Sequence, residues 1–218
     1  MQGFRSRHCT AALLALTIGA AAQAPAIPDT DAELTIFLSG RAVGRERVRV
    51  SHSGGTIIVS STGSSGAPLN LTINRFELKY AADWQPTELH IQATQATPGG
   101  TQSLGLETSF GLTSAINEVT KNRVTNSKTD QVSARTIVLP NNFFAGYVAL
   151  AARLGGTAPG ADLPVYVAPD TEIRMRVTGI TPQQIQSPEG AISAKQYALV
   201  FANPSGTIFC FLGGSPKS

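Results

Sequence analysis

The stretch NFFAGYVALAARL at residues 142–154, followed by Gly155, decides the fold of this chain. Its large apolar side chains recur at the three- and four-residue spacing of one helix face: Phe143, Tyr147, Leu150 and Leu154. The stretch carries a single charge, on Arg153, so most of the helix surface must be buried. We therefore predict a helix at about residues 142–154 in the centre of the fold, capped by Asn141 or Asn142 and ended by a left-handed Gly155.

Outside this helix, apolar and polar residues alternate as they do in antiparallel strands with one buried face. Val48 and Val50 alternate with arginines, and the apolar residues of 69–80 change parity near Asn74. A parity change indicates a β-bulge, which curves a sheet. Residues 180–190 contain two prolines and are predicted as a polar connection. The predicted fold class is mainly β (α+β), with a curved antiparallel sheet, a half-barrel, wrapped around one central helix.

The first 22 residues have the order of a secretory signal. Arg5 and Arg7 precede an uncharged apolar run, which is shorter than the roughly 20 residues needed to cross a bilayer, and small residues end at Ala22. We predict a signal peptide at residues 1–22 and a single β-rich domain at 23–218. We also predict export to the periplasm or the extracellular space, with no membrane span left after cleavage.

Charge and cysteine content exclude some partners for the exported chain. The full sequence has 17 Lys and Arg against 14 Asp and Glu, and two of the basic residues lie in the predicted signal. The remaining balance is close to neutral, so we predict no nucleic-acid partner, which requires a concentrated basic face. Loss of Cys9 with the signal leaves Cys210 without a partner for an internal disulfide.

No residue pattern indicates catalysis or metal binding. His52 and His90 are the only histidines after the predicted signal, and neither stands near other ligand residues in the sequence. The GSSG stretch at residues 63–66 lacks the spacing of the Gly-x-Ser-x-Gly elbow of hydrolases. We therefore predict no catalytic residues, no metal site and no cofactor.

A basic stripe is predicted on the strand that contains Arg45, Arg47 and Arg49, since alternate residues share one face. Two interpretations are open. The stripe is either a solvated outer face or a site that grips phosphate headgroups or another anionic polymer. Arg174 and Arg176 extend it only if the fold brings the two strands together.

Four segments carry a resemblance to a known family. They read IFLSG at 36–40 with VGRE at 43–46, FELKY at 76–80, VLPNNFF at 138–144, and LPVY at 163–166. Together they resemble exported bacterial proteins classed as domains of unknown function, the 3108-type family and its relatives. The resemblance implies a half-barrel similar in shape to periplasmic carriers of lipoproteins and lipids, in a Gram-negative periplasm. It implies no catalytic residues. The apolar run at 208–212 departs from the longer, more polar final strand of that family.

Three functions are compatible with these observations. The first is a non-enzymatic cell-envelope protein that binds an apolar or lipid-like ligand inside the curved sheet. Its expected ligand-binding residues are Phe143, Tyr147, Leu150 and Leu154 along the cavity, with Arg45, Arg47 and Arg49 at a headgroup. The alternative is a structural or interaction module with a packed interior and an exposed strand edge, at residues 114–134, for an envelope protein. The third is a hydrolase whose Ser, His and Asp come from distant segments.

Overall fold

Two β-sheets and one helix make up the computed structural model, which describes residues 28–187, 190–202 and 205–213. The predicted signal peptide, at residues 1–22, lies outside the described residues. The first sheet contains β1 (Thr30–Leu38), β2 (Arg41–Ser53), β3 (Thr56–Ser65), β4 (Leu71–Ala81), β5 (Pro86–Thr97), β6 (Gly100–Phe110), β7 (Ser114–Lys121) and β8 (Val124–Gln131). The second contains β9 (Ile137–Val138), β10 (Asp162–Val167), β11 (Thr171–Ser187), β12 (Gly190–Ala202) and β13 (Ser205–Gly213), and the helix is α1 (Tyr147–Leu154).

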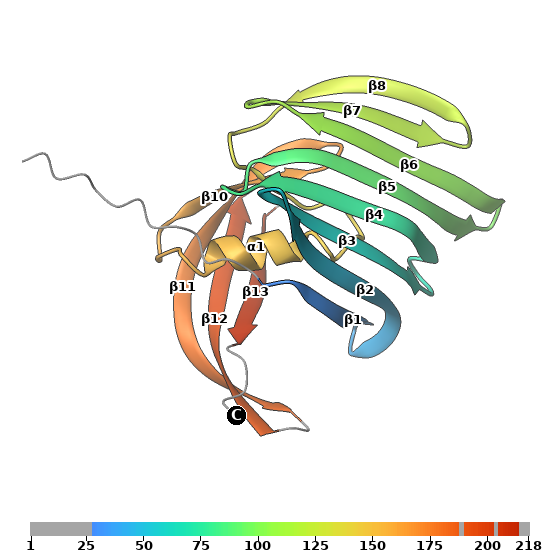
Figure 1. Ribbon diagram of the computed structural model, residues 1–218. Helices are drawn as coiled ribbons and strands as arrows, with labels where there is room; N and C mark the ends of the chain where they lie inside the picture. The colour runs from blue at the N-terminus through green and yellow to red at the C-terminus, as the bar shows by residue number, and fades with distance from the viewer. Residues whose placement is uncertain (1–27, 188–189, 203–204, 214–218) are drawn as a thin grey trace, which may run out of the picture.

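The eight-stranded sheet is a meander, in which every strand pairs antiparallel with the next one along the chain (Figure 1). Some of its hairpins turn on two residues with positive φ, such as Gly54 and Gly55 at 57° and 82°. Such turns match the right-handed twist of the strands that they join. The alternation predicted for β2 is confirmed, because Val48 and Val50 are buried while the arginines between and beside them are exposed.

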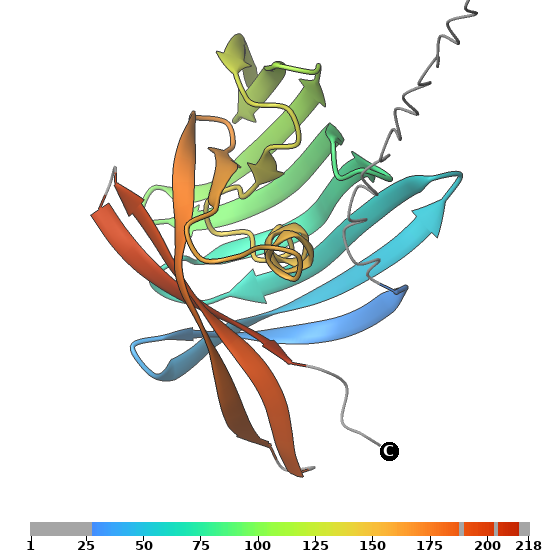
Figure 2. The same cartoon turned by 90° about the vertical axis from the view of Figure 1, so that its left-hand side faces the viewer.

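This sheet is strongly curled, because neighbouring strands are irregular at the same place. The pairing of β3 with β4 shifts register between Ser61 and Gly63, and that of β4 with β5 between Ile73 and Arg75. The second shift is the bulge predicted from the parity change. At the first, a Cβ on Gly63 would lie 2.4 Å from the carbonyl oxygen of Arg45, so only glycine permits this close approach. The resulting half-barrel confirms the predicted fold class (Figure 2).

Helix α1 lies on the concave side of the curled sheet, as predicted (Figure 2). Of its residues only Tyr147 is exposed, and its predicted end at Leu154 is confirmed. The predicted start is wrong. Asn142 has a left-handed φ of 69°, which a right-handed helix excludes, so the helix begins at Tyr147 after a series of turns. The predicted caps are also wrong: no side chain caps the helix, and Gly155 is right-handed at φ −54°.

The residue before the helix, Gly146, lies close against the end of β9. A Cβ on Gly146 would lie 2.7 Å from the carbonyl oxygen of Val138 and 3.2 Å from Leu139 Cδ2. Glycine therefore allows the first turn of α1 to press against the end of β9. The helix connects β9 to β10, which pair parallel within an otherwise antiparallel sheet.

The second sheet crosses one side of the half-barrel and extends into a long arm (Figure 1). The prediction of a loop at residues 180–190 is wrong, because β11 and β12 continue through it as a ladder that reaches Ser187 and Gly190. The side chains of residues 181–186 in β11 are all exposed, so apolar and polar residues do not alternate there as they do in a strand with one buried face. Main-chain pairing and polar contacts such as Gln183 Nε2 to Gln196 Oε1, at 2.9 Å, hold the arm together.

One hydrophobic cluster joins the concave face, the helix and the inner face of the second sheet. Its fully buried members include Phe76 and Leu78 from β4, Leu150 and Leu154 from α1, and Leu199 from β12. Within the described part of the chain, no helix has the length and apolar character needed to cross a bilayer.

Candidate functional site

A buried carboxylate on β2 fixes the segment that leads into the helix. Glu46 is fully buried. Its Oε1 accepts hydrogen bonds from Ser61 Oγ at 2.6 Å and from the main-chain N–H of Ala145 at 3.1 Å, and its Oε2 accepts one from the N–H of Phe144 at 2.9 Å. Free amides just before a helix favour a negative group. The Glu46 carboxylate thus ties the lead-in of α1 to the eight-stranded sheet.

Sequence reasoning missed Glu46, although a signal for it exists. Glu46 has the parity of Val48 and Val50, which places a carboxylate on the apolar face of β2. Charged residues are rarely buried unless they are paired or hydrogen-bonded. A glutamate in an apolar row therefore predicts a buried polar contact, although the sequence does not show which amides supply it.

A cavity of about 380 Å³ lies between the lead-in of α1 and the second sheet. This volume falls within the range of about 300–1,000 Å³ that is usual for small-molecule sites. The described residues that line it are Leu139, Pro140, Asn141, Asn142, Phe143, Phe144 and Tyr147 on one side, and Val165, Val167, Asp170, Thr171, Ile173, Met175 and Phe201 on the other. None of these residues belongs to the eight-stranded sheet, so the cavity lies beside the helix start rather than within the curl.

The cavity has an apolar wall and a polar rim. Its four polar lining residues, Asn141, Asn142, Asp170 and Thr171, are all exposed to solvent. Aromatic rings form much of the wall on the helix side. The ring of Phe144 stacks on that of Tyr147 with centroids 6.3 Å apart. Burial raises the pKa of the Tyr147 hydroxyl, and the neighbouring Cys210 thiol adds to this effect.

The structure brings together two of the four helix residues that were predicted to line a cavity. Phe143 and Tyr147 line it. Phe143 also stacks on Phe76 of β4, with centroids 6.0 Å apart, which fixes one wall against the half-barrel. Leu150 and Leu154 do not line it, because both are fully buried in the hydrophobic cluster further along the helix.

The structure does not bring the predicted arginines to the cavity. Arg45, Arg47 and Arg49 lie on the outer face of β2, where each of them faces carboxylates of β1. Arg47 forms two hydrogen bonds of 2.8 Å with Asp31. Hydrogen bonding from Arg47 lowers the pKa of the Asp31 carboxyl. Arg174 and Arg176 are on β11 in the other sheet and do not extend the stripe.

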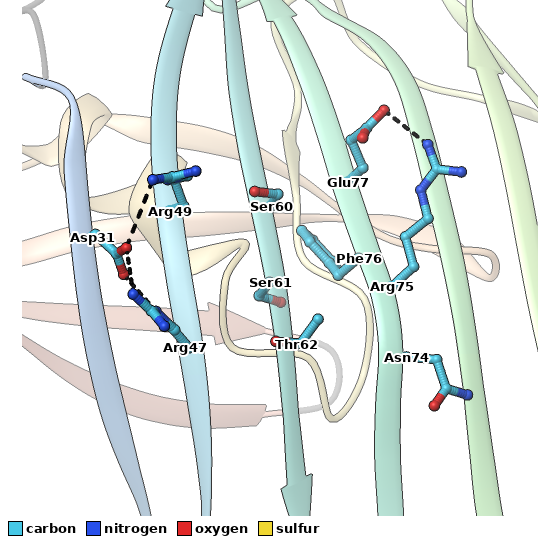
Figure 3. A pocket seen from close by; sticks show the side chains of 10 residues that line it. All are labelled: Asp31, Arg47, Arg49, Ser60, Ser61, Thr62, Asn74, Arg75, Phe76 and Glu77. Atoms are coloured by element: carbon cyan, nitrogen blue, oxygen red, sulfur yellow. Dashed lines mark hydrogen bonds and ion pairs between the residues drawn. The ribbon is translucent and has the colours of Figure 1, made fainter.

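The basic stripe borders a second depression, of about 360 Å³, on the outer face of β2–β4 (Figure 3). Ion pairs satisfy most of its charges, since Asp31 contacts Arg47 and Arg49 while Glu77 contacts Arg75 at 3.2 Å. Exposed pairs of this kind are typical of a solvated sheet face. The depression offers no apolar wall comparable to that of the first cavity, so it is the weaker candidate for a ligand.

A buried polar network links β7 and β8 of the eight-stranded sheet to β10 of the second sheet. Asn117 of β7 accepts a hydrogen bond from Thr108 Oγ1 at 2.8 Å and donates to the Tyr166 hydroxyl oxygen at 2.8 Å and to Asp130 Oδ2 at 2.9 Å. The Tyr166 hydroxyl donates to the same Asp130 oxygen at 2.5 Å. Burial raises the pKa of Tyr166 well above its usual value, and the Asp130 contact adds to this. The network is satisfied and serves to join β7 and β8 to β10.

Other polar residues form contacts that are typical of surface structure. His52 lies 2.7 Å from Asp29, and His90 lies 3.5 Å from Glu88. Among the described residues, no three His, Cys, Asp or Glu side chains gather closely enough to hold a metal ion. Trp84, at the β4–β5 turn, is buried and tilted against Tyr80, so it packs in the core rather than forming a binding platform.

Comparison of the chain with protein-family models, with curated proteins and with solved structures found no match in any of the three. The resemblance to the 3108-type family therefore stays a prediction.

Proposed function

We propose that this protein is a non-enzymatic binding protein of the cell envelope that holds an apolar, chain-like ligand beside the start of α1. The observation that carries the proposal is the cavity between residues 139–147 and the second sheet. At roughly 30 Å³ for a group of the size of a water molecule or a methylene, its 380 Å³ accommodates about a dozen chain carbons. An apolar wall with a few polar groups at the opening is the usual form of a site for such ligands.

The wall of this cavity is held in place by the fold, which supports a binding role. Phe144 and Ala145 are anchored by Glu46, and Phe143 packs on Phe76. A site whose walls are fixed before the ligand arrives loses little conformational freedom on binding. The assignment to the cell envelope rests on the predicted signal peptide and on the resemblance to exported bacterial proteins.

Binding of an uncharged solvatochromic dye such as Nile red tests the proposal. We expect saturable fluorescence enhancement with the parent protein. Ile173→Trp, which fills the cavity, is expected to abolish it. Ile58→Trp is the matched control, because Ile58 is half-buried and lies on the opposite, outer face of β3. Native mass spectrometry of protein purified from the envelope gives a second readout. Absence of dye binding by the parent, or equal binding by Ile173→Trp, contradicts the proposal.

A second candidate function is an interaction module that pairs with an envelope protein through β8. This strand forms one edge of the eight-stranded sheet, nearly all of its residues are exposed, and Val124 is 62% exposed. Exposed edges are templates for strand addition. Photo-crosslinking groups along β8, compared with groups on the outer face of β3, test this candidate. Equal crosslinking of a partner protein to β8 and to β3, or no crosslinking at either strand, contradicts this candidate function.

A further inference from the structure

The charge at the mouth of the cavity discriminates between classes of amphiphile. Asp170 is the only charged side chain among the described residues that line the cavity. It lies in the turn between β10 and β11 and is exposed. Arg45, Arg47 and Arg49 lie on the outer face of β2, and Arg174 and Arg176 of β11 do not line the cavity. The charge that the described lining residues place at the rim is therefore negative.

The Asp170 carboxylate is available for a ligand. Within the described part of the chain, no side chain forms an ion pair or a hydrogen bond with it, whereas Asp31 and Asp162 are each paired with an arginine. The nearest basic contact is Lys128, whose Nζ donates to the main-chain oxygen of Asp170 at 3.3 Å. Lys128 is itself paired with Asp130 at 3.2 Å and does not line the cavity.

The aromatic lining favours the same sign of charge. Phe143, Phe144, Tyr147 and Phe201 contribute four aromatic side chains to a cavity of this size. The faces of aromatic rings are negative and attract ammonium groups, and a carboxylate beside them adds a direct Coulomb attraction. The ring faces and the carboxylate would both repel an anionic headgroup.

We propose that the ligand is a cationic amphiphile, with an alkyl chain against the apolar wall and an ammonium group at Asp170. This inference rests on the proposed binding function and names the chemical class of its ligand. The same geometry discriminates against fatty acids and other anionic amphiphiles of equal chain length.

Displacement of bound Nile red by two charged amphiphiles of the same chain length, dodecyltrimethylammonium and dodecanoate, tests the inference below their micelle-forming concentrations. We expect the cation to displace the dye at roughly thirtyfold lower concentration. One exposed carboxylate at about 4 Å attracts the cation and repels the anion by on the order of 1 kcal/mol each, and about 1.4 kcal/mol corresponds to a factor of ten. Asp170→Asn keeps the size of the side chain and is expected to reduce the preference to within about twofold. Glu107→Gln removes one charge from the exposed outer face of β6 and is expected to leave the preference unchanged.

The outcomes separate this inference from the proposed function. If the dye binds but both amphiphiles displace it equally, or if Asp170→Asn keeps the full preference, the cationic ligand is refuted and the apolar site stands. If neither the dye nor either amphiphile binds, the proposed function fails and the inference fails with it. An effect of Glu107→Gln as large as that of Asp170→Asn, or larger, would also refute the role of Asp170, because each substitution removes one negative charge and the response would then not depend on the position of that charge.

Discussion

Glu46→Gln tests whether the buried carboxylate holds the start of the helix. Three donors converge on the two oxygens of Glu46: the Ser61 hydroxyl and the N–H groups of Ala145 and Phe144. Glutamine has nearly the same shape but only one acceptor oxygen. Whichever way the amide is oriented, its NH₂ group faces at least one of these donors, so at least one hydrogen bond is lost and the others become neutral.

The magnitude follows from the kinds of hydrogen bond involved. Bonds to a charged group contribute about 1.5–3 kcal/mol each, and neutral bonds contribute about 0.5–1.5 kcal/mol. Removal of a buried charge returns part of its desolvation cost, which offsets some of the loss. We therefore expect Glu46→Gln to lower the free energy of unfolding by about 2–4 kcal/mol. For a chain of this size, that corresponds to a Tm lower by roughly 4–16 °C.

Urea denaturation and hydrogen exchange provide the assays. Urea unfolding gives the free energy, and exchange of the Phe144 and Ala145 amides is expected to accelerate more than that of the β4 amides. Glu107→Gln is the matched control, because the same substitution on an exposed strand face is expected to change stability by less than about 0.5 kcal/mol. Ser61→Ala is expected to cost less in the Glu46→Gln background than in the parent. A Glu46→Gln variant within about 0.5 kcal/mol of the parent, with unchanged amide exchange, would refute the reasoning.

Three further variants test other parts of the structure. Gly146→Ala is expected to destabilise the fold by about 1–3 kcal/mol in thermal unfolding, because its Cβ would overlap the end of β9. Tyr166→Phe removes the buried hydrogen bonds that the hydroxyl forms with Asn117 and Asp130 and is expected to cost about 1–3 kcal/mol in urea unfolding, with no change in dye binding. Arg47→Ala is expected to lower stability at neutral pH only slightly, since the ion pair is exposed. It is expected to raise the pKa of Asp31 toward its ordinary value in an NMR titration, because the arginine lowers that pKa in the parent. The small stabilisation from this pair is present above the ordinary carboxyl pKa and is lost as pH falls through the lowered value.

The features that the sequence predicts are those in which a residue pattern reports burial directly. Alternation in β2 and the parity change in β4 identify which face is inward and where the sheet bends. The apolar stretch around Leu150 identifies the central helix and its end. In each case the hydrophobic effect acts on neighbours along the chain, so the pattern is local.

The features that the sequence misses depend on contacts between distant segments. Asn142 is left-handed, which excludes it from the helix, and α1 starts later than predicted, so Phe143 and Phe144 lie before the helix in the cavity wall. Glu46 finds two of its three donors almost one hundred residues away, and Asn117 finds Tyr166 in the other sheet. Residues 181–186 of β11, in the arm, are all exposed, so burial leaves no pattern there. The position of Asp170 at the cavity mouth likewise follows from the packing of sheets, which no local pattern describes.

The unbroken order of the eight-stranded meander bears on how the chain folds. Each strand from β1 to β8 finds its partner next in the chain, so the connecting loops are short and the entropic cost of closing them is small. Hydrogen bonds of high sequence separation join Glu46 to residues 144–145, Tyr166 of β10 to β7 and β8, and the main-chain N–H of Val138 to Tyr80 of β4. The slow step of folding should therefore be the docking of the helix and the second sheet onto a surface that has already formed. Until that docking, the Glu46 carboxylate is accessible to water, and its desolvation belongs to the final stage of the reaction.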